Sequence, residues 1–454
     1  MNIKTFPLRP FFFYFLILFF ILQSCNRKGK TNEQGVSIIS LDTTGIQPFL
    51  KSYPELDRYS EDYKTIYKHY DSHYIWFNEK GMVDYGESLY QRVKDLEEEG
   101  IYSVFPYEKE VDSIYGLKIK NPEEHLDAEL LMTGLYLFYV ENVYKGIDSK
   151  VTTDLGWLLP RKEFSETEVL DSIIAEREMS QNDSLMFGQY FKLRDALKKY
   201  KEIERNGGWT KIEVSKDVKL KPKDSSELIR QIRNRLYITG EIENDNGSNI
   251  YDEELKSGII AFQKHHGFNR DSVISAEHIS AMNRPVQDYI KTIVVNMERC
   301  RWLPSDFVQA DELILVNIPS YHLDFYRNGE IIFNSNVVVG SVMHKTVIFS
   351  GEMSYLAFSP YWNIPQSIVK NEIEPGIQRD PDYLKKRNMV RENGQVRQLP
   401  GRNNSLGLVK FMFPNENNIY LHDSPAKRLF GTPSTSSMPI RSETNPSRSK
   451  RPCW

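Results

Sequence analysis

The chain has 454 residues, with 58 Lys and Arg against 62 Asp and Glu, so its formal net charge is −4. This length has room for two or three domains. Because no long basic run occurs, we do not expect a nucleic acid as a partner. Hydrophobic residues make up 40% of the sequence and charged residues 26%. This is ordinary globular usage, which excludes a wholly disordered, collagen-like or multi-span membrane chain.

Three cysteines are spread widely over the chain, at Cys25, Cys300 and Cys453. Three such residues cannot build a disulfide framework or a zinc knuckle. Each of them therefore needs its own explanation.

The N-terminus carries an apolar run over residues 11–22, which follows two basic residues. Twelve residues are too few to cross a bilayer as a helix, and the pattern is typical of a secretory signal peptide. Leu22-Gln23-Ser24-Cys25 resembles a bacterial lipobox, which implies a lipoprotein signal peptide over 1–24 and lipidation at Cys25. A cleaved signal with an incidental cysteine is the alternative. The polar residues 25–47 then suit a flexible tether.

Helical spacing of apolar residues dominates from Pro48 to Asn206, for example at Leu89, Val93 and Leu96, and we expect a helical scaffold domain over 48–221. His69 and His73 lie four residues apart and could share a helix face. A metal site would need a third ligand, and no Glu lies between them in a His-Glu-x-x-His pattern, so we predict a packed or surface face and no metal.

Residues 222–285 predict three short helices. Ser225 or Ser226 can cap the first helix, which stops near Gly240, and Ser275 can begin the third. The landmarks resemble the peptidoglycan-binding domain found beside many cell-wall enzymes, and an unrelated three-helix bundle is the alternative. A linking helix is expected over 286–311, where Cys300 would be a small buried hydrophobic residue.

The apolar period changes to that of strands after residue 311. Residues 313–318 and 321–326 predict two strands, and Asn328-Gly329 predicts a hairpin turn into a third. Residues 337–340 should continue the sheet. The region therefore predicts an antiparallel β domain.

The segment 350–430 carries motifs in a recognisable order. These are Ser350-Gly351-Glu352, Pro360-Tyr361-Trp362-Asn363-Ile364-Pro365, Arg397-Gln398-Leu399-Pro400-Gly401, Asn403-Asn404, Leu406-Gly407, Val409-Lys410-Phe411-Met412-Phe413-Pro414-Asn415 and Tyr420-Leu421-His422-Asp423-Ser424-Pro425. With the helical region and the three-helix unit, they closely resemble the large periplasmic L,D-transpeptidases with a YkuD-type catalytic domain. The resemblance implies an α+β multidomain protein with an incomplete antiparallel β-sandwich at 312–430, including a capping insertion at about 355–400.

This resemblance implies peptidoglycan cross-linking by cysteinyl acyl transfer, without a metal or another cofactor. A thiolate attacks the donor stem peptide, D-alanine leaves, and an acceptor amine resolves the thioester. By the same resemblance, Tyr420, His422 and Asp423 belong to a strand end that lines the pocket, where His422 is neither nucleophile nor general base. Tyr361, Trp362 and Asn363 resemble the lid over the substrate. The expected partners are stem peptides and glycan, with the chain lipid-anchored in the cell envelope and facing the periplasm.

The family's catalytic signature, Ser-His-Gly-Cys-Ile/Val-Arg, is absent from the sequence. A forced alignment places Ser437 where the histidine belongs and Pro439 where the nucleophile belongs. Residues 431–454 are rich in Ser, Thr and Pro and predict a disordered tail outside the family, in which Cys453 has no histidine after His422 to activate it. A frameshift or premature stop, or a genuine non-catalytic relative that binds peptidoglycan, would each explain the junction. Either way, we expect this chain to be inactive.

Overall fold

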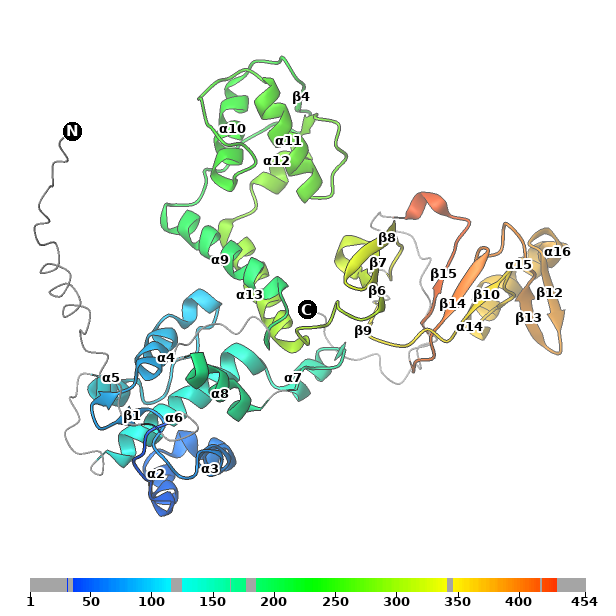
Figure 1. Ribbon diagram of the computed structural model, residues 1–454. Helices are drawn as coiled ribbons and strands as arrows, with labels where there is room; N and C mark the ends of the chain where they lie inside the picture. The colour runs from blue at the N-terminus through cyan, green and yellow to red at the C-terminus, as the bar shows by residue number, and fades with distance from the viewer. Residues whose placement is uncertain are drawn as a thin grey trace, which may run out of the picture. The chain divides into compact units, whose positions relative to one another are not determined.

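The computed structural model of the protein describes residues 31, 36–115, 125–163, 165–176, 185–340, 346–416 and 419–430 (Figure 1). The signal peptide, Cys25 and the tail 431–454 lie outside the described residues. Those described form two compact units. Unit 1 contains residues up to Lys145 and Glu163–Glu176, and unit 2 contains Gly146–Lys162 and the residues from 185 onward. Within the described part of the chain, no helix is both long and apolar enough to cross a membrane.

Unit 1 is built around one central helix, α6 (Leu126–Val140), whose residues from Ala128 to Val140 are all buried. A helix that is hydrophobic all round needs neighbours on every side. The helical character expected for this part of the sequence is confirmed. The other helices and strands of unit 1 are α2 (Ile46–Ser52), α3 (Ser60–His69), α4 (Asp84–Lys94), α5 (Glu108–Tyr115), α8 (Glu166–Glu176), β1 (Phe77–Asn78) and β2 (Gly81–Met82).

The second half of the expected tether is part of unit 1, which corrects that prediction for residues 36–47. The backbone N–H of Ser37 donates to the Tyr74 carbonyl at 3.1 Å, and that of Leu41 donates to the Ser72 carbonyl at 2.6 Å. Val36 and Leu41 are buried. Buried apolar side chains and backbone hydrogen bonds to the 72–74 segment attach this otherwise polar segment to unit 1.

The two histidines of unit 1 make separate contacts. His69 Nε2 lies 3.0 Å from a carboxylate oxygen of Asp171, and His73 Nδ1 lies 3.1 Å from the Tyr70 carbonyl. Among the described residues, no group of three or more His, Cys, Asp or Glu side chains is placed to hold a metal ion.

Two long helices of unit 2 pack along each other, α9 (Gln189–Arg205) and α13 (Val286–Trp302). The rings of Tyr200 and Tyr289 stack between them with centroids 5.2 Å apart. α13 follows the predicted linking helix but ends at Trp302. Cys300 is buried, as expected, and burial raises the pKa of its thiol to about 11 against the opposing effect of Arg301.

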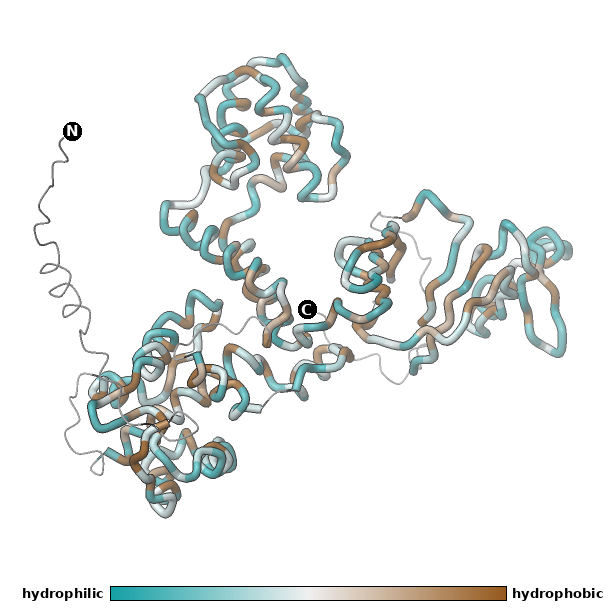
Figure 2. Tube along the Cα trace, in the orientation of Figure 1, coloured by the Kyte–Doolittle hydropathy of each residue, from teal (hydrophilic) through white to brown (hydrophobic). Residues whose placement is uncertain are grey.

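The three predicted short helices of unit 2 are present as α10 (Glu227–Thr239), α11 (Glu253–His265) and α12 (Ala276–Met282). The strand β4 (Lys219–Leu220), which precedes α10, pairs antiparallel with β5 (Ile274–Ser275), which precedes α12. Ser226 caps α10 by accepting the Leu228 N–H, and Gly240 ends it with φ +82°. Hydrophobic and hydrophilic stretches alternate along these helices (Figure 2). We call residues 212–283 the three-helix subdomain.

A segment from the predicted scaffold domain, Gly146–Lys162, belongs to unit 2. It contains α7 (Ser149–Asp154) and β3 (Trp157–Leu158), and β3 pairs in parallel with β9 (Ile348–Phe349). Glu298 of α13 accepts the backbone N–H of Ile147 at 2.6 Å and the indole N–H of Trp302 at 2.7 Å. This carboxylate therefore fixes the start of the segment on the end of α13.

The β region, residues 312–430, contains three small antiparallel sheets. Their strand orders are β6-β7-β8, β10-β14-β15 and β11-β13-β12. The turn between β7 and β8 has positive φ at both Asn328 and Gly329, as the sequence predicts for a hairpin. The strands are β6 (Glu312–Asn317), β7 (His322–Arg327), β8 (Glu330–Asn336), β10 (Tyr355–Phe358), β11 (Trp362–Asn363), β12 (Met389–Glu392), β13 (Gln395–Gln398), β14 (Val409–Met412) and β15 (Leu421–His422).

Residues 337–340 do not continue a strand, which corrects the sequence prediction. β8 ends at Asn336, and Val337–Val339 line a cavity instead. A run of valines favours a strand, but it needs a hydrogen-bonding neighbour to form one. The segment expected to form an insertion, at about 355–400, contributes α14 (Gln366–Ile368), a π-helical turn at Val369–Ile373, α15 (Glu374–Arg379) and α16 (Tyr383–Lys386).

Candidate functional site

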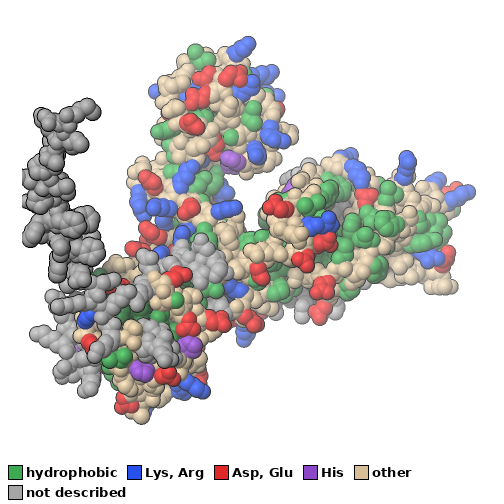
Figure 3. All heavy atoms as spheres, in the orientation of Figure 1, with side chains coloured by type: hydrophobic (Ala, Val, Ile, Leu, Met, Phe, Trp, Pro, Cys, Tyr) green, Lys and Arg blue, Asp and Glu red, His purple; other side chains and the backbone are tan. Residues whose placement is uncertain are grey.

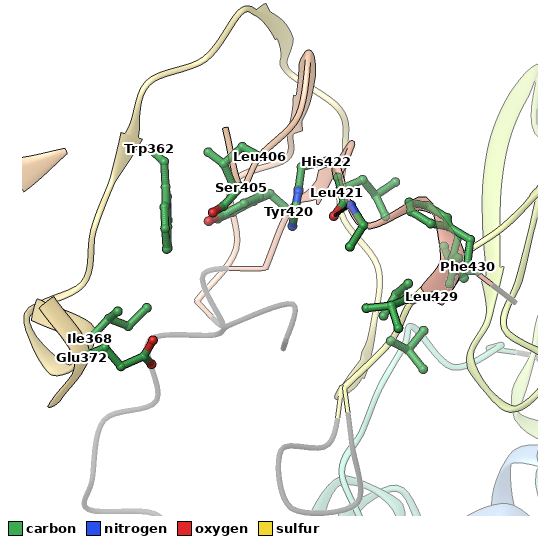
Figure 4. Close-up of a pocket in the computed structure, with 16 residues that line it drawn as sticks. Trp362, Ile368, Glu372, Ser405, Leu406, Tyr420, Leu421, His422, Leu429 and Phe430 are labelled. Atoms are coloured by element: carbon green, nitrogen blue, oxygen red, sulfur yellow. Dashed lines mark hydrogen bonds between the residues drawn. The ribbon is translucent and has the colours of Figure 1, made fainter. Parts of the chain in front are cut away.

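A cavity of about 320 Å³ lies in the β region, between the insertion and the end of β15 (Figure 4). Trp362, Ile368 and Glu372 line it from the insertion, and Tyr420 and His422 line it from β15 and the residue before. The remaining lining residues are Val316, Val337, Val338, Val339, Ser405, Leu406, Leu421, Ser424, Ala426, Leu429 and Phe430. The cavity is thus mainly apolar, with a few polar groups, as is usual for a small-molecule site.

His422 is the histidine among the described residues that line this cavity. Its Nδ1–H donates to the Asp423 carbonyl at 2.5 Å. A carbonyl can only accept, so the neutral ring carries its proton on Nδ1 and leaves Nε2 as an acceptor. Burial lowers the pKa of His422 below its ordinary 6.5, and the Lys410 ammonium lowers it further, against the hydrogen bond to Asp423. At neutral pH the ring is therefore uncharged.

Tyr420 and His422 are held by the neighbouring strand. Lys410 of β14 is the cross-strand partner of His422, and its ammonium lies 3.6 Å from the centroid of the Tyr420 ring. This distance is that of a cation–π contact. Burial lowers the pKa of Lys410.

Asp423 lies behind the cavity wall and anchors it. One carboxylate oxygen accepts the Leu408 N–H at 3.1 Å, and Lys427 forms an ion pair with the other. Burial by itself would raise the pKa of Asp423, but these hydrogen bonds bring it below the ordinary value. Gly407 has φ +61°, and a Cβ there would lie 2.5 Å from Asp423 side-chain atoms. Glycine at 407 is what lets the loop approach the carboxylate so closely.

The loop 399–406 is fixed by two buried amides. Asn404 donates to the Pro360 carbonyl at 3.1 Å and accepts the Leu406 N–H at 2.8 Å. Gln398 accepts the Ser405 N–H at 2.9 Å and donates to the Arg387 carbonyl at 3.1 Å. Satisfied buried amides specify one backbone arrangement. They place Ser405 and Leu406 on the cavity.

Comparison with known proteins agrees with this architecture. Residues 311–447 match the L,D-transpeptidase catalytic domain, and residues 61–197 match the scaffold domain that accompanies it. A Haemophilus influenzae protein named "Putative L,D-transpeptidase" is 32% identical over 159 residues, which cover 30% of this chain and 32% of that protein. The chain therefore contains an L,D-transpeptidase catalytic domain and a scaffold domain.

This match spans about a third of the length of the relative, so it does not concern a whole protein. The domain match extends to residue 447 and overlaps the segment 431–454, which we expected to lie outside the family. The α+β multidomain character implied by the resemblance is confirmed. The sandwich arrangement stays a prediction, because the described strands form separate three-stranded sheets.

The L,D-transpeptidase domain brings three of the six expected site residues to one cavity, namely Trp362, Tyr420 and His422. Asp423 lies directly behind them. Tyr361 and Asn363 are both exposed and do not line the cavity. The Arg397 guanidinium lies 4.9 Å from the centroid of the Tyr361 ring. Because side chains alternate along β11, Trp362 faces the cavity while its two neighbours face away.

Sequence reasoning missed several lining residues of the L,D-transpeptidase domain, among them Glu372, Ser405 and Leu406. Ser405 and Leu406 follow the Asn403-Asn404 motif directly, so the motif could have pointed to them. Glu372 lies between motifs in a helical segment and gave no signal of its own.

Cys300, the cysteine that the structure describes, is buried in α13 and does not line the cavity. A raised thiol pKa also disfavours the thiolate that attack requires.

Proposed function

We propose that this L,D-transpeptidase family member binds peptidoglycan stem peptides in its β-region cavity and does not carry out the cysteinyl acyl transfer itself. The observation that carries the proposal is a cavity lined by the Tyr420–His422 strand end in a chain whose sequence contains no His-Gly-Cys motif. The family acts on peptidoglycan, which makes stem peptides the natural ligand class.

The chemistry of acyl transfer supports the inactive half of the proposal. The reaction needs a thiolate, a base beside it and backbone N–H groups for the oxyanion. At the aligned position Pro439 offers no nucleophile, and Ser437 offers no base. His422 has a neutral Nε2 that can accept a hydrogen bond, but by resemblance its role is to shape the site.

Carbapenem acylation tests this half of the proposal. We expect no mass increase when the purified chain is incubated with a carbapenem and measured by intact mass spectrometry, because the reactive thiolate is missing. An active member of the family, treated in parallel, should gain the mass of one carbapenem. A carbapenem adduct at Cys300 or Cys453 would contradict the proposal.

The binding half of the proposal also includes the three-helix subdomain, whose landmarks resemble a peptidoglycan-binding domain. Attachment to a membrane through a lipid at Cys25, in the cell envelope and facing the periplasm, completes it. Co-sedimentation with isolated sacculi is the test, and we expect the chain in the pellet. Recovery in the supernatant alone would count against peptidoglycan binding. Metabolic labelling with a fatty acid, compared between the wild-type chain and Cys25→Ala, tests the lipid.

A further inference from the structure

A second cavity, of about 200 Å³, lies within unit 1. Its wall comes from α3, α6 and α8 (Figure 1) and from the turns before α3 and after α6. Five charged side chains line it, namely Arg58, Asp62, Glu141, Lys145 and Glu166. The wall therefore differs from that of the mainly apolar β-region cavity, and it suits a charged ligand.

Four of these five charged side chains are paired with one another. Arg58 donates to the Glu141 carboxylate at 2.6 Å, and Lys145 forms an ion pair with Glu166. With all five ionised, two cations stand against three carboxylates, which leaves a net charge of −1. The unbalanced charge is that of Asp62.

The Asp62 carboxylate forms no hydrogen bond or ion pair with another described residue. Asp62 lies in the first turn of α3, where the helix dipole favours a negative charge. Even so, burial raises its pKa, and the carboxylates of Glu166 and Glu141 raise it further against the opposing effect of Lys145. A cation placed beside Asp62 would relieve this unfavourable charge.

Two neutral side chains complete the wall and offer it apolar surface, Leu137 and Tyr59. Both are buried. The Tyr59 hydroxyl donates to Glu141, and the Arg58 guanidinium lies 4.6 Å from the centroid of its ring. Since a cavity of about 150 Å³ holds a benzene molecule, this one holds a ligand of about eight non-hydrogen atoms. A short aliphatic chain with one cationic end fits both the size and the charge.

The backbone at this cavity departs from a regular helix. Glu141 and Lys145 are the two ends of a π-helical turn that directly follows α6, and both line the cavity. π-helical turns occur frequently at functional sites. The turn thus presents a carboxylate and an ammonium to the same ligand.

We propose that unit 1 binds a small aliphatic primary amine in this cavity, with the ammonium on the Asp62 carboxylate and the carbon chain against Leu137. The amine is either a free molecule or the end of a lysine side chain. One ammonium brings the cavity and its ligand to zero net charge. An organic cation fits better than a metal ion, because no group of three or more His, Cys, Asp or Glu side chains among the described residues is placed to hold a metal.

Saturation-transfer NMR on the full chain tests the inference with three probes. Pentylamine carries the ammonium, and 1-pentanol is its uncharged counterpart of equal size. Nα-acetyl-lysine N-methylamide carries the same amine on a peptide-like molecule. The proteins are the wild-type chain, Asp62→Asn and Glu61→Gln. Glu61 is the matched control, because it is the neighbouring acid of α3 but pairs with Lys64 and does not line the cavity.

We expect the wild-type chain and Glu61→Gln to bind pentylamine about fivefold more tightly than 1-pentanol, the upper range for an accessible ion pair. Asp62→Asn should lose this preference. Asp62→Ser is a second neutral variant, and circular dichroism checks that each variant is folded. Binding of the lysine probe together with pentylamine would assign the site to side chains, and binding of pentylamine alone would assign it to free amines.

Three results would overturn the amine site. The wild-type chain could bind neither amine, or it could bind 1-pentanol as tightly as pentylamine. The folded neutral variants of Asp62 could also keep the preference of the wild-type chain for pentylamine. None of these results bears on peptidoglycan binding by the β region, which is tested separately with sacculi.

Discussion

The three-helix subdomain and the β region lie in the same unit of the chain but bury their apolar residues to very different extents. Ile229, Ile232, Leu236, Leu255 and Ile279 of the subdomain are entirely inaccessible to solvent or nearly so. In the β region, Ile332 and Phe333 of β8 are 56% and 57% exposed, and Phe358 of β10 is 75% exposed. Figure 3 shows hydrophobic side chains gathered on the surface of the β region.

This difference in burial reflects how helices and strands complete their backbone hydrogen bonds. Helices complete their backbone hydrogen bonds internally, so three short ones close a core within about seventy residues. Strands need neighbours, and β8 and β10 are edge strands of three-stranded sheets. No further described strand pairs with their outer edges, and their exposed apolar faces make them an aggregation hazard.

The largest expected effect is the loss of a core residue from the subdomain. Leu236→Ala should lower the free energy of local unfolding of α10–α12 by about 2 to 5 kcal/mol, because it removes a fully buried side chain and leaves a cavity. Hydrogen exchange by mass spectrometry over residues 227–282 measures this. Tyr237→Ala, at the adjacent exposed position, is the control and should change exchange little. Equal effects of both variants would show that the subdomain core is less complete than its burial indicates.

A smaller loss of stability is expected at the cavity wall of the β region. Gly407→Ala forces a left-handed residue and a contact with Asp423, which should cost about 1 to 3 kcal/mol in local stability. Gly394→Ala is the matched control, because Gly394 also has positive φ but a methyl group added there would meet nothing within 4 Å. Hydrogen exchange over residues 405–424 should increase more in the first variant. If both variants lose the same local stability, the positive φ alone explains the loss and the contact with Asp423 adds nothing.

A pH dependence of local stability should appear at the cavity wall. Since burial lowers the pKa of His422 below 6.5, the unfolded state binds the proton more tightly than the folded state. The contribution of the neutral ring to stability is present above pH 6.5 and is lost as the pH falls toward the folded pKa. Hydrogen exchange of β14 and β15 should therefore accelerate between pH 7 and pH 5.5, after correction for the intrinsic rate. His422→Gln should remove the acceleration.

The smallest effect on stability is expected at the exposed strand edge. Phe358→Thr should change local stability by less than about 0.5 kcal/mol, because the side chain is largely exposed and threonine also favours strands. Self-association should decrease, as measured by sedimentation velocity over a concentration series. Tyr102→Thr, an exposed aromatic outside any strand, is the control and should leave association unchanged. An unchanged sedimentation profile for Phe358→Thr would show that β10 does not contribute to self-association.

Local sequence predicted the helical elements well, because their signals lie within one element. Ser226, Gly240 and Ser275 mark helix ends in the sequence and do so in the structure. The Asn328-Gly329 turn likewise follows from the backbone preferences of two adjacent residues. The L,D-transpeptidase catalytic domain was evident from motifs in 350–430, because they combine several residue types in a fixed order.

Contacts between residues far apart in the chain determined the features that local sequence patterns could not predict. Residues 36–47 bind to unit 1 through backbone partners at 72–74. Val337–Val339 line a cavity, and no described strand pairs with them. Because side chains alternate along β11, Trp362 lines the cavity and its neighbours Tyr361 and Asn363 do not. Glu372 lines the cavity from a π-helical turn. The sequence alone determined the resemblance to L,D-transpeptidases and the absence of their catalytic signature, since both depend on residue identity. Only the tertiary structure decided which side chains share the cavity, since that depends on contacts between residues far apart in the chain.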